Sequence, residues 1–455
     1  MKKQKLAAGL ALAMTMVAPM TALAAGQPGW VLKGNDWYYN NRSGEAEQNV
    51  WRDNAAKTAK FYLGDDGKMV TNSLVDHDGN MYYVNGDGVQ SRNQWRLLET
   101  DEDEEARWYY FSEGGKAYEE GWKTINGKKY HFTDYKMDYG FLSEDGDMLD
   151  GDEESIWEEA VYYVGDNTTG WRQDNVWLSI DDFDTSEYDR QDIIWLRFGS
   201  NGKKIVDKTT SVDNKKYAFD SKGAMVSEWH GSATPSDADY KYYNDSTGAQ
   251  ERGHWFQAIP SEDQNADDFH DDTYRWFYAL SNGKTVKDTV KTINGKKYIF
   301  DANGIMKTGF VVVDSNNHIV DVLGGEDGDM PSSSEIIGAK SDGTLMYFDR
   351  DGAMKSGRFN LELDDDNYTF KFSKTGKALH AASDGYLYNN GILIKANKDD
   401  GYKYSIATVD GKDYLVNTSG KIMKAGKYTS DDLKWEVAGD NTNGYTITVG
   451  PKDDK

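Results

Sequence analysis

The stretch TINGKKYIFDANGIMKTGF, residues 292–310, places a short aromatic strand between two Asn-Gly pairs, Asn294-Gly295 and Asn303-Gly304. Asn-Gly between β-type runs is the strongest short signal for a hairpin, because both central turn positions require positive φ. A close copy, TINGKKYHF, starts at Thr124, and a looser copy, SVDNKKYAFDSKGAM, starts at Ser211. The chain therefore repeats one hairpin-forming unit.

Alternation along these strands predicts which side chains are buried. Side chains separated by two positions share a face of a strand. The Tyr and Phe of each KKY copy are therefore expected to form one buried face, namely Tyr130 with Phe132, Tyr217 with Phe219, and Tyr298 with Phe300. The alternate position varies between copies, which predicts a solvent-facing surface at His131, Ala218 and Ile299.

A longer repeat of about 80 residues lies over the hairpins, with tyrosine pairs at 82–83, 162–163 and 242–243. Each pair leads to a Trp, then to an acidic insert and an aromatic strand; the three tryptophans are Trp95, Trp177 and Trp255. One hairpin is marginally stable alone, whereas stacked hairpins bury each other's aromatic faces. Regular hairpins without helical periodicity predict an all-β fold, an elongated β-solenoid of stacked hairpin repeats with acidic loop insertions.

Four segments follow from composition. Residues 1–24 read as a secretory signal peptide, with an early Lys cluster, an apolar run and Ala22-Leu23-Ala24 as the cleavage site. Residues 25–320 hold the hairpin repeats, 321–343 an acidic and Ser-rich loop or break, and 344–455 degenerate hairpins with a C-terminal cap. No later apolar run is long enough to span a membrane, and the C-terminal GPKDDK has no sorting signal. We expect a secreted or cell-surface protein attached non-covalently to the wall.

Charge and residue content exclude several function classes. The net charge of −25 disfavours nucleic acid, which requires a cationic surface. The chain has no Cys, and its seven His residues show no metal-ligand spacing; the acidic runs from Glu144 and Gly325 lack the calcium-loop pattern, so neither metal nor cofactor is expected. No nucleophile elbow occurs, and no non-repeat segment is large enough for a catalytic domain. The prediction is no enzyme and no catalytic residue, although paired acids for glycoside hydrolysis stay open.

The segment WYYFSEGGKAYEEGWKTINGKKYHF, residues 108–132, resembles the cell-wall-binding repeat family, which includes choline-binding modules and glucan-binding repeats. The shared elements are Trp108-Tyr109-Tyr110, Gly114-Gly115 and Gly121-Trp122. The resemblance covers most of the chain and is strongest at 108–135 and 274–310. The chain departs from the pattern at the Trp residues that no Gly precedes, and in the short units that carry KKY in place of WYY; these tryptophans are Trp95, Trp177, Trp229 and Trp255.

The resemblance implies a β-solenoid with shallow aromatic sites between successive units. In choline-binding relatives, two Trp and an aromatic of the next unit surround a quaternary ammonium, which implies a cage of Trp108, Trp122 and Tyr130 here. A cation over aromatic faces gains about 0.5–2 kcal/mol, and sugar rings stack on the same surfaces. Trp is seldom fully buried, which favours Trp over Tyr as a ligand residue. The remaining aromatic candidates are Trp276, Tyr298, Trp37, Trp95, Trp177 and Trp255.

The expected function is that of an exported, non-catalytic protein that binds wall polysaccharide or choline-decorated teichoic acid. Many weak sites on one chain would raise the overall affinity. One alternative is a surface adhesin that uses the solenoid as a rod toward a host protein or glycan. A second alternative is a wall hydrolase with an unrecognised active site.

Overall fold

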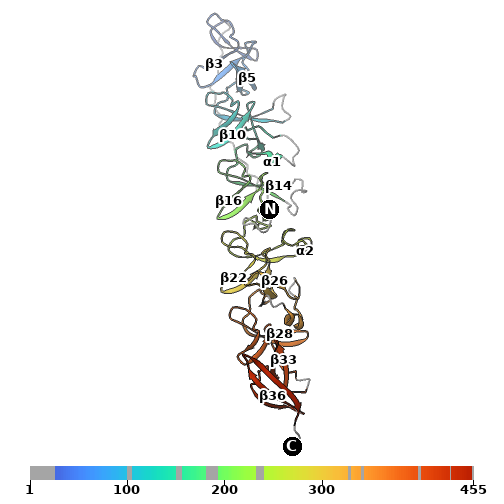
Figure 1. The fold of residues 1–455 in the computed structure, drawn as a ribbon. Helices are drawn as coiled ribbons and strands as arrows, with labels where there is room; N and C mark the ends of the chain where they lie inside the picture. Colours follow the sequence, from blue (N-terminus) through green and yellow to red (C-terminus); the bar gives the residue numbers. More distant parts are fainter. Residues whose placement is uncertain are drawn as a thin grey trace. The chain divides into compact units, whose positions relative to one another are not determined.

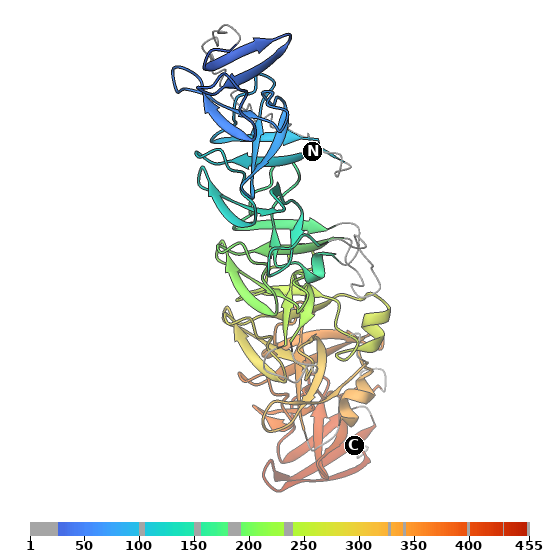
Figure 2. The same ribbon diagram turned by 90° about the horizontal axis from the view of Figure 1, so that it is seen from above.

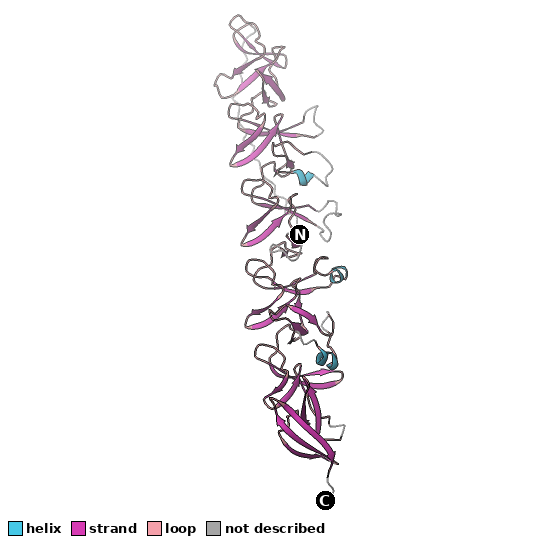
Figure 3. Cartoon of the chain, viewed as in Figure 1, coloured by secondary structure: helices cyan, strands magenta, loops and turns pink. Residues whose placement is uncertain are grey.

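The computed structural model describes residues 26–99, 105–149, 156–180, 193–231, 240–325, 329–339, 343–397, 401–430 and 432–452. The expected signal peptide and the central parts of the acidic inserts after Glu99 and Ser179 lie outside these residues. The chain divides into two compact units, residues 1–208 with 219–225, and residues 209–218 with 226–455. Nearly all regular structure in both units is antiparallel β, which confirms the all-β fold class (Figure 3).

The first unit consists of consecutive hairpins that pair strands adjacent in sequence (Figure 1). Its strands are β1 (Gly29–Lys33), β2 (Asp36–Asn40), β3 (Val50–Asp53), β4 (Lys60–Leu63), β5 (Ser73–His77), β6 (Asn80–Val84), β7 (Gln94–Leu98), β8 (Arg107–Phe111), β9 (Gly121–Ile125), β10 (Lys128–Thr133), β11 (Lys136–Met137), β12 (Phe141–Leu142), β13 (Tyr162–Tyr163), β14 (Val176–Ile180) and β15 (Ile194–Phe198). The hairpin of β16 (Lys208–Val212) and β17 (Lys215–Phe219) lies at the division of the chain.

The second unit continues the hairpin pattern (Figure 2). It also contains larger sheets, up to the five-stranded sheet β28-β29-β32-β31-β30. Its strands are β18 (Glu228–His230), β19 (Lys241–Tyr243), β20 (Trp255–Ala258), β21 (Arg275–Tyr278), β22 (Thr289–Ile293), β23 (Lys296–Phe300), β24 (Met306–Lys307), β25 (Gly309–Val313), β26 (Ile319–Val322), β27 (Thr344–Phe348), β28 (Gly357–Leu363), β29 (Asp366–Phe372), β30 (Ala381–Ser383), β31 (Tyr386–Asn389), β32 (Ile392–Leu393), β33 (Tyr404–Val409), β34 (Lys412–Asn417), β35 (Gly426–Ser430), β36 (Leu433–Asp440) and β37 (Gly444–Pro451).

The hairpin turns confirm the prediction from Asn-Gly. Asn294 and Gly295 have φ of 49° and 81°, and Asn126 and Gly127 have φ of 50° and 80°. Both central residues therefore adopt the positive φ that a two-residue hairpin turn needs. Asn303-Gly304 serves a different turn, because only its glycine has positive φ and the Asp301 N–H donates to the Ile305 carbonyl at 3.0 Å.

Backbone hydrogen bonds join several hairpins in each unit to the segment that follows the next hairpin. In the first unit, the Met69 N–H donates to the Trp37 carbonyl at 2.8 Å, and the Gln90 N–H donates to the Lys60 carbonyl at 2.9 Å. In the second unit, the Ala378 N–H donates to the Leu345 carbonyl at 2.9 Å. These bonds satisfy strand groups that a two-stranded hairpin would leave unpaired. Stacking of hairpins inside each unit is therefore fixed by the backbone as well as by side chains.

Turn glycines allow this close stacking. Gly115 has a φ of +86°, and a Cβ added there would lie 2.6 Å from Cδ of Gln90. Gly283 in the second unit, with the same φ of +86°, stands in the same relation to Gln250, at 2.7 Å. Each glycine thus lies against the residue that follows an earlier turn. A larger residue is disfavoured there, because its side chain would clash with that neighbour and because positive φ suits glycine.

The expectation that the varying strand face meets solvent is wrong. His131 is 4% exposed, Ala218 2% and Ile299 0%. The following segments cover this face. Gly146 lies against the His131 ring, and Ile299 belongs to a core cluster with Val311. Both faces of these hairpins are therefore packed, because each has a neighbour on either side.

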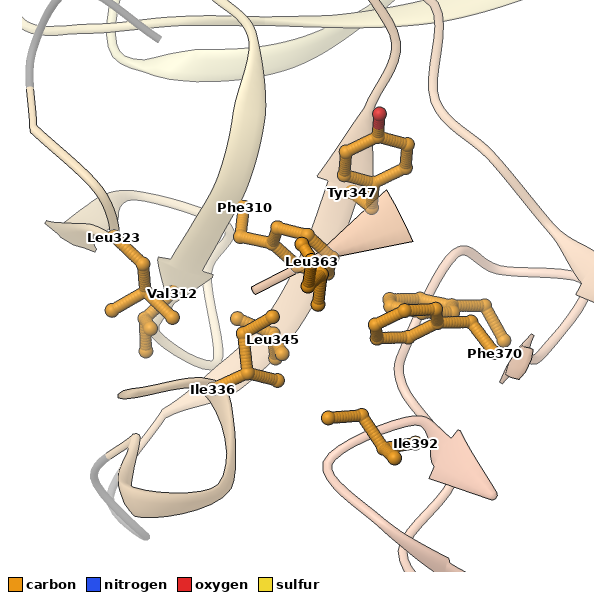
Figure 4. Packing of buried hydrophobic residues seen from close by; sticks show 10 residues of the cluster. Phe310, Val312, Leu323, Ile336, Leu345, Tyr347, Leu363, Phe370 and Ile392 are labelled. Atoms are coloured by element: carbon orange, nitrogen blue, oxygen red, sulfur yellow. The ribbon is translucent and has the colours of Figure 1, made fainter. Parts of the chain in front are cut away.

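In the described parts of the chain, three short helices occur where the sequence indicated none: α1 (Ile156–Glu159), α2 (Ala266–His270) and α3 (Ser333–Gly338). In α3, the Ser332 hydroxyl caps the Glu335 N–H at 3.1 Å, and Ile336 is fully buried. Ile336 packs with Phe310, Leu345 and other residues that Figure 4 labels. The segment expected as a loop or break thus contributes to the core, while the domain boundaries around it stay a prediction.

The third acidic insert, residues 261–273, lies wholly within the described residues. It is folded, and it is not the acidic loop that the sequence indicated. Asn265 caps α2 by accepting a hydrogen bond from the Asp268 N–H. Asp268 is buried and accepts a hydrogen bond from Nε of Arg275 at 2.8 Å. The side chain of Gln264 donates to the Asn303 carbonyl at 2.9 Å. No helix in the described segments has the length and apolar character needed to cross a membrane.

Candidate aromatic binding site

The candidate site begins with the register of the hairpin β7–β8. Trp95 lies opposite Tyr110, and Leu97 lies opposite Trp108. Directly opposed side chains share a face, as do side chains two positions apart. Trp95, Trp108 and Tyr110 therefore lie on one face of this hairpin.

The next hairpin, β9–β10, adds rings to the same cluster. The centroid of the Trp95 ring lies 6.4 Å from Trp108, 5.0 Å from Tyr110, 4.8 Å from Tyr130 and 5.9 Å from Phe132. The first three contacts are edge-on or tilted, while Phe132 is stacked at 17°. We call these five residues the Trp95 cluster.

The second unit contains the same arrangement. Trp255 lies opposite Tyr278 in the hairpin β20–β21, and Gln257 lies opposite Trp276. The Trp255 ring centroid lies 6.4 Å from Trp276, 5.2 Å from Tyr278, 4.7 Å from Tyr298 and 5.6 Å from Phe300. Each distance matches its counterpart in the Trp95 cluster to within 0.3 Å. These five residues form the Trp255 cluster.

Burial divides each cluster into a floor and a rim. Phe132 and Phe300 are fully buried, so they form the floor. Trp276 is 44% exposed and Trp108 is half-buried, so these indoles form the rims. An exposed indole next to buried rings offers a flat apolar surface to a ligand.

Burial also raises the pKa of tyrosines in the first cluster. Desolvation raises the pKa of Tyr110, with a contribution from Tyr118, and desolvation alone raises the pKa of Tyr130. Both phenols therefore stay neutral at physiological pH. The Tyr110 hydroxyl lies 2.6 Å from Oδ1 of Asn93, to which it donates a hydrogen bond.

Several other indoles are covered by cations from the chain itself. The ammonium of Lys128 lies 3.0 Å from the centroid of Trp171, and the guanidinium carbon of Arg172 lies 5.8 Å from that of Trp122. Among the described residues, no Lys or Arg cation lies over the central indoles Trp95 and Trp255 or over the rim indoles Trp108 and Trp276. Within the described parts, no three His, Asp or Glu side chains converge as metal ligands.

The structure groups the aromatic residues differently from the cage of Trp108, Trp122 and Tyr130 that the resemblance implied. Trp108 and Tyr130 do belong together, but the ring between them is Trp95. Trp122 lies opposite His131 in the hairpin β9–β10, on the other face from Tyr130. Its ring contacts His131 at 4.9 Å and Tyr162 at 5.2 Å. Alternation places neighbouring strand residues on opposite faces, so Trp122 cannot join this cluster.

The remaining candidates lie elsewhere or in incomplete copies. Trp37 packs at the edge of a core cluster with Trp30 and Phe61. Trp177 contacts Phe219 and Arg197. An earlier copy surrounds Trp51, which contacts Tyr62 at 5.0 Å and Tyr82 at 5.1 Å.

That earlier copy departs from the pattern at the rim. Lys60 lies opposite Asp53, at the register position that Trp108 holds in the Trp95 cluster. The copy therefore has no rim indole. Sequence reasoning missed Tyr110, Tyr278, Phe132 and Phe300 as cluster members. The signal lay in the patterns WxY and KKYxF that follow Trp95 and Trp255.

Comparisons with known proteins add sequence similarity to this geometry. The glucosyltransferase-S of Streptococcus mutans is 27% identical over 195 residues, 43% of this chain and 11% of that protein. The glucosyltransferase-I of Streptococcus downei is 23% identical over 409 residues, 79% of this chain and 24% of that protein. The resemblance to the cell-wall-binding repeat family is confirmed. The chain thus corresponds to less than a quarter of the length of these curated relatives.

Among solved structures, the modular autolysin LytC of Streptococcus pneumoniae, in complex with a synthetic peptidoglycan ligand, matches with a TM-score of 0.39 and 18% identity. The match covers 63% of this chain and 54% of the autolysin. No protein-family model matches the chain.

Proposed function

We propose that this protein is a non-catalytic binding protein of the bacterial surface, which holds wall polysaccharide or choline-decorated teichoic acid through the Trp95 and Trp255 clusters. The observation that carries the proposal is the recurrence of one five-ring geometry in both units. A core needs buried aromatics, but it does not need a partly exposed indole beside an inner tyrosine at the same register positions twice. Binding of the same kind of ligand at both clusters explains why a rim indole is kept at this position in each.

The chemistry of the rim suits two kinds of ligand. A sugar ring can stack on an indole face, and a quaternary ammonium gains about 0.5–2 kcal/mol over such a face. The net charge of −25 favours a neutral or cationic group at the contact over an anionic one. The similar segments occur in proteins named glucosyltransferases, which supports a glucan as the neutral candidate. Choline is the cationic candidate.

Two weak sites on one chain suit attachment to a polymer. After one cluster binds, the second acts at a raised effective concentration, so avidity exceeds the affinity of either site. The proposal includes export, a surface location and non-covalent attachment. Fractionation of the source cells tests it: the protein should leave the walls with competing ligand or detergent.

We also infer that the hairpins build a β-solenoid. The support is the recurrent backbone bond from one hairpin to the segment after the next, which occurs in both units. Small-angle scattering of the purified protein should give a maximum dimension well above that of a globular chain of this length. A compact scattering profile would refute the solenoid but leave the binding sites untouched.

A wall-binding assay tests the function. The full-length mature protein is mixed with purified walls, with dextran beads and with choline-derivatised beads, and the bound fraction is measured against concentration. The variants Trp108→Ala and Trp276→Ala each remove one rim, and we expect each to weaken binding about tenfold, as loss of roughly 1.4 kcal/mol would. Tyr402→Ala is the matched control, since Tyr402 is an exposed aromatic (40%) outside both clusters.

The outcomes separate the candidate functions. Retention of wild type on walls or one bead type, with loss in the rim variants, supports the proposal. Failure of wild-type protein to bind any of the three supports sinks it. Clearing of walls in a zymogram would show hydrolysis and overturn the non-catalytic role, while binding to host cells but not to walls would favour an adhesin.

A further inference from the structure

A third hairpin, β14–β15, has the register of the two complete clusters but a different residue at its centre. Trp177 lies opposite Arg197, and Ser179 lies opposite Trp195. Trp195 is 38% exposed and occupies the rim position of Trp108 and Trp276. Arg197 occupies the position of the inner tyrosine, Tyr110 or Tyr278.

The floor of this third copy is present. The rings of Trp177 and Phe219 lie 5.7 Å apart at 32°. The corresponding pairs of the complete clusters lie 5.9 Å apart at 17° and 5.6 Å apart at 24°. The central indole, the floor and the rim indole have thus all been retained, and the inner tyrosine is the replaced position.

The replacement places a permanent cation on the central indole. The guanidinium carbon of Arg197 lies 5.5 Å from the centroid of the Trp177 ring, and Arg197 is only 9% exposed. This separation is within the range of a cation–π contact, which gains strength when the cation is shielded from water. Arg keeps its charge at every physiological pH, so the contact cannot be titrated away.

We propose that Arg197 is an internal occupant of the third cluster and determines its specificity. Its guanidinium lies against the central indole Trp177, where it takes the place of a ligand ammonium or sugar ring. Within the described residues, the chain then presents two ligand sites of this type, around Trp95 and Trp255, and a third that is closed. The inference rests on the proposed function, since it concerns the same kind of site.

A pair of reciprocal substitutions tests the inference on the full-length mature protein. Arg197→Tyr restores the residue of the complete clusters, and Tyr278→Arg places a guanidinium at the centre of the Trp255 cluster. Equilibrium dialysis with radiolabelled choline, and separately with a dextran-derived oligosaccharide, gives the number of molecules bound per chain. Circular dichroism and urea unfolding establish that each variant is folded. Arg197→Lys, which keeps a cation at the position, is the matched control.

The expected numbers are two for wild type and Arg197→Lys, three for Arg197→Tyr and one for Tyr278→Arg, with the same probe. Wild type at two with Arg197→Tyr also at two would overturn the inference and leave the proposed function intact. Wild type at three would overturn it as well. Wild type at zero with Arg197→Tyr at one would refute the proposed function yet support occupation by Arg197, and zero for both would end both ideas.

Should Arg197→Tyr fail to fold, Tyr278→Arg decides alone. A fall from two sites to one shows that a guanidinium at this register position closes the cluster. An unchanged count of two in folded Tyr278→Arg contradicts the inference.

Discussion

Lys204 is a buried cation whose removal should change how stability depends on pH. Its ammonium donates hydrogen bonds to the carbonyls of Trp157 at 2.5 Å and Glu158 at 2.8 Å, at the end of α1. Burial lowers the pKa of Lys204 from 10.5 to about 8, although the charges of Asp220 and Glu158 oppose the shift. The Lys204→Met substitution keeps the length and apolar stem of the side chain and removes its proton equilibrium.

The sign follows from the lowered pKa. Between pH 8 and 10.5, the unfolded chain holds a proton on Lys204 that the folded chain has released, so the free energy of unfolding rises with pH. One pKa unit corresponds to about 1.4 kcal/mol, and the titration between pH 7 and pH 10 covers most of the shift. We expect wild type to gain about 2.5 kcal/mol relative to Lys204→Met over this interval.

Urea unfolding, followed by tryptophan fluorescence at pH 7 and pH 10, measures this difference. The comparison between variants cancels the titration of the many tyrosines, which both proteins share. Lys203→Met is the control, because its neighbour Glu144 raises the pKa of exposed Lys203 and its titration falls above this interval. Parallel pH dependence of wild type and Lys204→Met would show that Lys204 is not desolvated in the folded protein.

Three further outcomes test the packing. Phe300→Ala removes a fully buried floor ring and should lower the free energy of unfolding by about 3–5 kcal/mol in a urea titration; a loss below 1 kcal/mol would contradict its place in the core. Gly115→Ala should cost at least about 1–2 kcal/mol because of its positive φ, while Gly114→Ala, whose added Cβ would meet only Oγ of Ser112 at 3.9 Å, should be nearly neutral; equal melting temperatures would refute the turn argument. Asp268→Asn removes the buried partner of Arg275 and should cost about 3 kcal/mol, with faster hydrogen exchange in α2; unchanged exchange would show the insert to be independent of this pair.

The hairpins were predictable because their signals are local. Asn-Gly turns and alternating aromatics act within a few residues, so Asn294-Gly295 and the buried Phe300 follow from the sequence directly. Burial of His131 and Ile299 did not follow, because it depends on segments that stack on the outer face from later in the chain. A single hairpin carries no information on whether its second face is covered.

The site was predictable in composition but not in membership. Trp108 and Tyr130 were recognised, yet their common neighbour Trp95 precedes an acidic insert that conceals the pairing of β7 with β8. The insert separates Trp95 from Trp108 in the sequence, so the sequence alone does not show which residues of β7 and β8 lie opposite each other. The helix α3 had a readable start in Ser332 and Glu335, and it was overlooked because a single helical turn has no visible periodicity.

The backbone bonds that tie each hairpin to the segment after the next have a consequence for synthesis. The partners are close in sequence, as in Met69 with Trp37 and Gln90 with Lys60, so the mean sequence separation of such contacts is short. Low contact order favours rapid folding. No thiol has to be oxidised, since the chain lacks Cys. The amino-terminal hairpins can therefore fold while the rest of the chain is still being synthesised.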